Sequence, residues 1–192
     1  MAGLRFREAA RRAVRCFSAE SRDARIDAIV EKYVTRGRGV GLSQPLLWGD
    51  MDAYAHLNNC KYFVHFETAR IKYFAAMVEI GKELDPAFDG DGFITGRSVG
   101  PILASTACKF IRPCAYPDTL HTFATVDPET VAESGFEMVK TTFSEAQGFE
   151  RPAAVGRGTI VTVDYAREPP ARAPVPGVLR EAIVRLGEAA RP

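Results

Sequence analysis

Two aspartates, a histidine and two asparagines lie close together between Asp50 and Asn59. Either Asp50 or Asp52 supplies a carboxylate that can act as a general base or as a nucleophile. His56 adds a titratable side chain, and Asn58 and Asn59 directly precede an unbroken helical pattern. The free N–H groups and the positive dipole end at a helix N-terminus favour negative charge. The stretch therefore predicts a site that holds a developing oxyanion, although the residues alone do not choose between the two aspartates.

The element that must position these groups is a helix over residues 60–80. Neither proline nor glycine interrupts this range, which allows about 30 Å of helix at ~1.5 Å per residue. Asn58 or Asn59 is the expected N-cap and Gly81 the expected end. So wide an apolar stripe predicts a helix that other structure largely encloses. Its members are Tyr62, Phe63, Phe66, Ala69, Tyr73, Phe74, Met77 and Val78.

The rest of the chain is mainly of extended character. Short links rich in proline, glycine and aspartate separate four runs rich in Thr, Val, Ile and Phe, which favours antiparallel neighbours. Gly156 and Gly158 predict a bulge or a close backbone approach. One long apolar helix followed by such strands predicts an α+β fold with a curved antiparallel sheet wrapped around the helix. The expected strands are 101–112, 119–127, 136–144 and 155–165, preceded by a short strand over 42–48, and residues 85–92 are an expected loop.

Length, charge and cysteine content exclude several classes of protein. The chain has 192 residues and a net charge of +1, and no apolar run reaches the ~18 residues of a membrane helix. Residues 1–17 hold five arginines and one acid, so the other residues together carry a net charge of −3, which argues against a nucleic-acid partner. Beyond residue 17 there are three cysteines, Cys60, Cys108 and Cys114. They form no C-x-x-C pair, so no disulfide framework or metal site is indicated.

Composition divides the chain into four segments. Residues 1–17 are rich in arginine and alanine and poor in acid, as in a mitochondrial transit peptide, and Phe17 ends a sequence similar to a matrix-processing site; an ordinary basic helix is the alternative. Residues 18–42 are expected to contain a short amphipathic helix over 21–34 and a glycine-rich connector. Residues 43–167 form the main domain. Residues 168–192 comprise a proline-rich link and a last short helix, and both ends of the chain are expected to be peripheral.

The stretch at residues 48–59 (WGDMDAYAHLNN) and the helix after it resemble the signature of the 4-hydroxybenzoyl-CoA thioesterase-like family, D-x-D-x-x-G-H-V-N-N, an aromatic residue, then F-E-x-A-R. The resemblance covers residues 43–186 and implies the hotdog fold. Ala55 stands where the family usually has glycine, and Leu57 where it has valine. If that glycine has a positive φ, alanine alters the turn. The helix matches through Tyr62, Phe66, Glu67, Ala69 and Arg70.

The resemblance implies hydrolysis of an acyl thioester, usually an acyl-CoA, by a homodimer or homotetramer with sites at subunit interfaces, without a metal or cofactor. It implies that Asp52 is the catalytic carboxylate, as base or as nucleophile, and that the backbone N–H of Asn59 polarises the thioester carbonyl. His56 orients the thioester, Asn58 holds the turn or contacts substrate, and Tyr54 contacts substrate. Three basic residues are candidates to meet CoA phosphates across a subunit boundary. They are Arg97, Lys109 and Arg112.

Several alternatives stay open. In the simpler interpretation, Asp50 is a solvated acid of the turn. Cys60 and His56 could form a nucleophilic pair, but a packed Cys60 is the preferred interpretation. His65 and His121 have no obvious partners. A hotdog protein can also bind acyl groups without hydrolysis, or act as an enoyl-CoA hydratase, although hydratases use a different motif. No motif in the sequence specifies the acyl chain or distinguishes CoA from acyl carrier protein as the carrier of the thioester.

Overall fold

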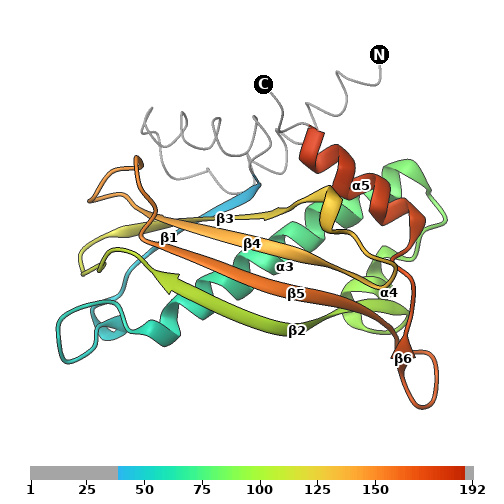
Figure 1. The fold of residues 1–192 in the computed structure, drawn as a ribbon, viewed down its shortest axis with the longest axis horizontal. Coiled ribbons are helices and arrows are strands. Elements are labelled where there is room, and N and C mark those ends of the chain that lie inside the picture. The colour runs from blue at the N-terminus through green and yellow to red at the C-terminus, as the bar shows by residue number, and fades with distance from the viewer. Residues whose placement is uncertain (1–38, 189–192) are drawn as a thin grey trace.

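A computed structural model describes residues 39–188, in which a curved antiparallel sheet covers one long helix (Figure 1). The sheet has the strand order β1-β3-β4-β5-β2, with a short strand β6 paired to β5. The α+β hotdog fold expected from the sequence is thus confirmed. The elements are β1 (Val40–Pro45), the 3-10 helix η2 (Trp48–Asp50), α3 (Asn59–Leu84), α4 (Gly90–Thr95), β2 (Val99–Phe110), β3 (Thr119–Val126), the 3-10 helix η3 (Pro128–Thr130), β4 (Gly135–Ser144), β5 (Ala154–Asp164), β6 (Ala171–Arg172) and α5 (Gly177–Glu188).

The central helix α3 is longer than its pattern indicates. It passes through Gly81, the expected end, and stops at Leu84, before Asp85 and Pro86. The residue before a proline is biased away from helical backbone, which explains the stop. Gly81 instead permits close packing, because a Cβ there would lie 3.1 Å from Phe88 and 3.2 Å from Leu179. Gly81 therefore serves helix contact and not termination.

The four long strands begin and end within two residues of their expected bounds, whereas the first ends at Pro45, three residues early. The short strand β6 was not expected, because its residues lie in the proline-rich link. The loop expected over 85–92 is shorter, because α4 already begins at Gly90 with Asp89 as its N-cap. The helix expected over 21–34 and the processing site at Phe17 lie outside the described residues.

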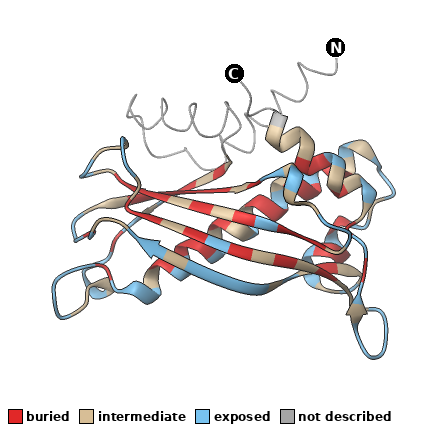
Figure 2. Ribbon diagram, viewed as in Figure 1, coloured by how far each residue is buried: buried red, intermediate tan, exposed pale blue. Residues whose placement is uncertain are grey.

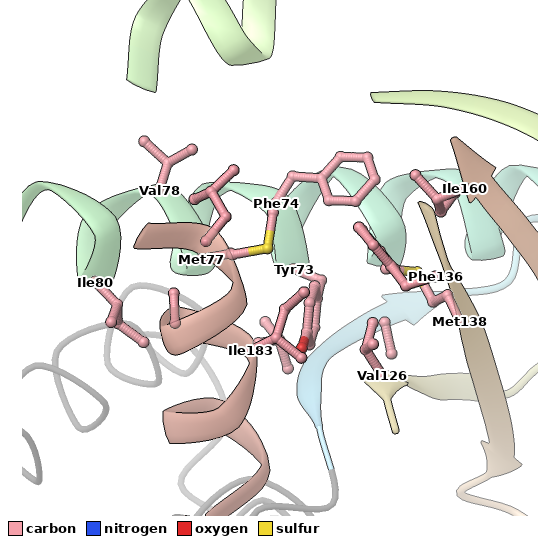
Figure 3. Packing of buried hydrophobic residues seen from close by; sticks show 14 of the residues in the cluster. Tyr73, Phe74, Met77, Val78, Ile80, Val126, Phe136, Met138, Ile160 and Ile183 are labelled. Atoms are coloured by element: carbon pink, nitrogen blue, oxygen red, sulfur yellow. The ribbon is translucent and has the colours of Figure 1, made fainter. Parts of the chain in front are cut away.

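Two apolar clusters fill the space between α3 and the sheet. The proximal cluster lies under the first two turns of α3, and the distal cluster lies under its second half. In the distal cluster, Tyr73, Phe74 and Met77 of α3 pack among side chains of the sheet and of α5 (Figure 3). The proximal cluster contains Leu46, Leu57, Tyr62, Phe66, Cys114, Leu120, Ala153 and Ala154.

The C-terminal helix belongs to the distal cluster. Leu179, Ala182 and Ile183 of α5 are completely buried and pack against α3 (Figure 2). The expectation of a peripheral C-terminal end is therefore wrong for α5. Its apolar face, visible in the sequence, is the face that closes one end of the helix–sheet sandwich.

Polar residues separate the two clusters under the middle of α3. Thr122 and Thr142 are buried on facing strands and share a hydrogen bond of 2.9 Å. Lys140 lies beside them on β4 and is also buried. This polar band divides the interior of the fold into two parts.

Candidate active site

A tight closed turn precedes α3. The N–H of Asp52 donates to the carbonyl of His56 at 2.7 Å, and the N–H of Asn58 donates to the carbonyl of Asp50 at 3.0 Å. Between these bonds, Met51 and Leu57 form an antiparallel bridge. The turn thus brings residues 50–52 alongside residues 56–58, at the leading end of the helix.

The carboxylate of Asp52 is held by the backbone of this turn. Its Oδ1 accepts the N–H of Tyr54 at 2.8 Å and the N–H of His56 at 3.2 Å. Within residues 39–188, Oδ2 has no hydrogen bond, and the residue is only partly buried. One oxygen is therefore oriented, and the other can meet water or a substrate.

Asp50 has a different role in the same turn. Its Oδ1 pairs with the Lys61 ammonium at 2.8 Å, and its Oδ2 accepts the N–H of Leu47 at 2.9 Å. The hydrogen bond from Lys61, followed by that from Leu47, lowers the pKa of Asp50 below its ordinary value. Both oxygens are engaged, so the structure separates the two aspartates that the sequence alone leaves equivalent.

The start of α3 leaves a backbone donor free. Asn58 is the N-cap, and its side chain accepts the N–H of Cys60 at 3.0 Å, while its carbonyl accepts the N–H of Lys61 at 2.9 Å. Asn59, the first helical residue, has no intrahelical acceptor for its N–H. Among the hydrogen bonds of the described residues, none uses that N–H, and Asn59 is exposed. The expected oxyanion donor is therefore accessible.

Ala55 has the backbone conformation of a glycine. Its φ is +58°, and it is the one non-glycine residue in the described part of the chain with positive φ. The turn closes at this positive φ with alanine in place of glycine, and the Ala55 N–H donates to the Asp52 carbonyl at 3.0 Å. An alanine in this region carries strain of about 1–2 kcal/mol.

The remaining candidates in the turn are exposed. The side chains of His56 and Tyr54 lie at the surface, Tyr54 at 82% exposure. Cys60 is exposed too, so the expectation of a packed cysteine is wrong. Cys60 is the second residue of α3, and at this position its side chain lies outside the helix–sheet interface. The roles of His56, Tyr54 and Asn58 toward a substrate stay predictions.

The three basic candidates for phosphate contacts lie apart from one another. Arg97 precedes β2, whereas Lys109 is near the other end of that strand, and both are exposed. Arg112 donates to the carbonyls of Gln147 and Gly148, each at 3.4 Å, and to that of Arg151. Arg112 therefore holds a loop within this chain, and Arg97 lies far from the turn along β2. Their contacts with CoA stay predictions.

Two histidines have surroundings that the sequence does not reveal. His121 is buried on β3, with Nδ1 at 2.7 Å from the Ser43 hydroxyl and Nε2 at 3.2 Å from a Glu145 oxygen. Burial lowers the pKa of His121. His65 is buried on α3, and its Nδ1 has no partner in the described chain. Only cross-strand register, which the pattern of residues does not give, brings Ser43 opposite His121.

The region 39–188 contains no cluster of three or more His, Cys, Asp or Glu residues able to hold a metal ion. In the same region, no helix combines the length and apolarity that crossing a bilayer requires.

The sequence profile of a family described as the thioesterase-like superfamily matches residues 46–183. That range includes the turn, α3, all but the first strand, and most of α5. No curated protein sequence matches the chain significantly.

Several solved structures share the fold. A thioesterase complexed with coenzyme A and Zn from Thermus thermophilus is 22% identical, with a TM-score of 0.59, covering 79% of this chain and 95% of its own. The PA5185 protein of Pseudomonas aeruginosa is 25% identical, with a TM-score of 0.58, covering 79% and 93%. A gentisyl-coenzyme A thioesterase, BH1999, is 16% identical, with a TM-score of 0.56, covering 74% and 98%. The chain thus spans nearly the whole length of these proteins.

Proposed function

Because the chain belongs to the thioesterase-like superfamily, we propose that it hydrolyses an acyl-CoA thioester to the free acid and CoA, with Asp52 as base or nucleophile. The geometry of the turn carries this proposal. One Asp52 oxygen is fixed by two backbone N–H groups, the other is free within the described structure, and the free Asn59 N–H lies at the helix start. A carboxylate beside a fixed donor is what attack on a thioester carbonyl requires.

The chemistry follows one of two routes. As a base, Asp52 removes a proton from water, the resulting hydroxide adds to the carbonyl, and the thiolate of CoA leaves and takes up a proton. As a nucleophile, the Asp52 carboxylate adds to the carbonyl and expels the thiolate, and water then hydrolyses the mixed anhydride. In both routes the tetrahedral oxyanion accepts a hydrogen bond from the Asn59 N–H. A single turnover in water labelled with heavy oxygen tests the second route: label in the Asp52 carboxylate, from attack of water on the Asp52 carbon of the anhydride, would establish it, because the first route never labels the protein.

The first test replaces Asp52 by Asn, which keeps the side-chain oxygen that accepts the Tyr54 and His56 N–H groups. We expect thiol release from an acyl-CoA panel to fall about 10²- to 10⁴-fold, the usual contribution of a positioned base. Asp50→Asn is the matched control, and its rate should stay within about tenfold. Equal rates for wild type and Asp52→Asn would remove Asp52 from the mechanism. Tight acyl-CoA binding without turnover in the wild type would favour a binding protein instead.

The second test removes the Asn59 N–H while keeping the helix. Proline is tolerated at the first helical position, and Asn58, at φ −58° and ψ 135°, already has the extended backbone that precedes proline. We expect Asn59→Pro to be about 10²- to 10³-fold slower than Asn59→Ala, which retains the N–H. Similar rates for the two variants would exclude this amide as the oxyanion donor.

We propose that the protein acts as a homodimer or homotetramer through β2 and the adjoining face of α3. β2 is an edge strand, and unpaired edges favour pairing with another chain. Large apolar side chains are exposed along these two elements, as expected for an interface. They are Phe63, Val64, Ile71, Ile102 and Phe110. Analytical ultracentrifugation should show an oligomer, and Ile102→Glu should shift it toward the monomer; a monomeric wild type would overturn this assignment.

We propose the mitochondrial matrix as the location, on the composition of residues 1–17. Residues 1–17 fused to a fluorescent protein should direct it to mitochondria, and the mature chain should begin at Ser18. Cytosolic fluorescence from this fusion would contradict the assignment.

A further inference from the structure

Lys140 is a charged residue in the interior of the fold. It is 1% exposed, and its Nζ has no hydrogen-bond partner among the described residues. The side chain crosses the neighbouring strand β5 at Gly158, where an added Cβ would lie 2.8 Å from Nζ and 2.9 Å from the Ser105 carbonyl oxygen on β2. Gly158 thus makes room for the lysine, and the amine reaches the region beneath the edge strand. Next to it, between Leu103 and Ser105, the β2–β5 pairing has a bulge.

A second cation, Arg70, is close enough to this amine for its charge to lower the pKa of Lys140. The Arg70 guanidinium on α3 is mostly buried, and its one ion pair within residues 39–188 is with the exposed Glu67 carboxylate, at 3.5 Å. Burial, and then the charge of Arg70, lower the pKa of Lys140 to about 8, against a smaller opposing effect of Glu137. Two adjacent cations with so little opposing charge are costly in an interior. A carboxylate between them would satisfy both.

The helix connects this pair of cations to the candidate active site. Asn59 and Arg70 are eleven residues apart, close to three full turns at 3.6 residues per turn, so they lie on one face of α3. Phe63 and Phe66 lie on the same face between them, with their rings 6.1 Å apart in an edge-to-face contact. An apolar stretch of α3, in which Phe63 is partly exposed and Phe66 is buried, therefore connects the Asn59 end of the helix to Arg70.

This side of α3 adjoins an uncovered part of the sheet. Among the strands, α3 packs most closely on β1 and β3. It meets the end of β2 where the rings of Tyr62 and Phe110 are 5.2 Å apart, but residues 104–107 in the middle of β2 are exposed (Figure 2). The middle of β2 is therefore the part of this edge that is open to a ligand, and it pairs with Gly158, beside which the Lys140 amine lies.

We propose that Lys140 and Arg70 bind a carboxylate at the far end of the acyl group, so that the preferred substrates are CoA thioesters of dicarboxylic acids. This specificity rests on the acyl-CoA thioesterase activity proposed above. The rise from Asn59 to Arg70 is about 16 Å, and the Arg70 side chain leans back toward the N-terminus by about one turn. Chains of suberoyl or sebacoyl length match this span, whereas succinyl is too short.

The test compares matched pairs of substrates that differ only in the terminal group: butanoyl-CoA with succinyl-CoA, octanoyl-CoA with suberoyl-CoA, and decanoyl-CoA with sebacoyl-CoA. In the wild type, kcat/KM should favour the dicarboxylic member of the longer pairs and not of the short pair. In Lys140→Met and Arg70→Gln, the ratio of suberoyl-CoA to octanoyl-CoA should fall about 10- to 100-fold, mainly through KM, as expected for a hydrogen bond to a charged group. Arg157→Met, an exposed charge on the outer face of β5, is the matched control and should keep the ratio.

A binding measurement separates failure of this inference from failure of the activity. Suberate should raise the melting temperature of the wild type, octanoate should not, and Lys140→Met should lose the response. If the wild type hydrolyses none of the thioesters but responds to suberate, the hydrolase assignment fails and the carboxylate site stands. If it hydrolyses them and Lys140→Met keeps the wild-type ratio, the site is overturned. If Lys140→Met keeps that ratio but changes the oligomeric state, the carboxylate belongs to a second copy, which also overturns it.

Discussion

The two halves of α3 lie in contrasting surroundings. The second half is enclosed by the distal cluster, where Tyr73 and Met77 are buried by both the sheet and α5. The first half begins in an exposed turn with a strained alanine, and nearby Trp48 and Tyr54 are almost fully exposed. The distal half thus has the properties of a completed core, whereas the turn at the leading end of α3 has those of a surface that is completed by a ligand or by another subunit.

This contrast implies a division of labour along one helix. Apolar packing in the distal half fixes the helix relative to the sheet, and the helix then holds its leading amide in place beside Asp52. Backbone strain and exposed apolar groups are concentrated at the leading end of α3, where a substrate or a second subunit would bind. Substitutions in the distal half should therefore change stability, and substitutions in the turn should change turnover.

The largest effect on stability is expected for Leu179→Ala. Leu179 is fully buried between α5 and α3, so the substitution leaves a cavity and should lower the free energy of unfolding by about 2–5 kcal/mol. Urea denaturation measures this change. Activity per folded molecule should stay near the wild-type value; a loss of turnover at full folding would show that the two halves are not separable. Leu186→Ala, at a partly buried position on the same helix, should cost less.

The fold was predictable to the extent that it depends on local pattern. The helix around Phe66 and Tyr73 and the strands after it carry strong periodic signals, and so their existence follows from the residues. The end of α3 was not predictable, because Gly81 has the residue type of a helix end but instead allows close packing against Phe88 and Leu179. That contact, like the burial of α5, depends on segments distant in sequence.

The candidate site was predictable as a stretch but not as a set of roles. Asp50 and Asp52 are equivalent by residue type, and it is their contacts in the folded turn that distinguish them, above all the ion pair of Asp50 with Lys61. Lys140 gives no signal at all, because a lysine in an alternating strand normally faces solvent. Its inward position follows from the register of β4 against β5 and from the space at Gly158.

The boundary between the two halves is tested by Lys140→Met. Replacing buried ionic groups with apolar residues of similar volume is often stabilising, by about 1–4 kcal/mol, so we expect a higher free energy of unfolding at pH 7. The pKa of Lys140 is lowered from 10.5 to about 8, so between these values the unfolded wild type binds more protons than the folded protein. Wild-type stability should then rise with pH across that window, closing the gap to the variant. A gap independent of pH would mean that the amine is not desolvated.

A smaller effect is expected for Asp50→Asn. The variant loses the ion pair with Lys61 but keeps an oxygen for the Leu47 N–H, so stability should fall by about 1 kcal/mol. Because the pKa of Asp50 is lowered in the folded protein, this contribution is present above the unfolded pKa and is lost as pH falls through the folded value. Denaturation of both proteins at neutral pH and below pH 3.8 measures it. A difference that persists unchanged in acid would assign the loss to packing instead of charge.

The smallest effect, and the one that addresses the turn most directly, is expected for Ala55→Gly. At φ +58° alanine is strained and glycine is not, but glycine also gains freedom in the unfolded chain, so the free energy of unfolding should rise by less than about 1 kcal/mol. Ala53→Gly is the matched control in the same exposed turn. It relieves no positive φ and should lower stability by about 0.4–1 kcal/mol. Opposite signs for two alanines two residues apart would locate the strain at position 55. If both substitutions destabilise, the turn is not strained, and the exposed end of α3 has no more stored energy than the buried one.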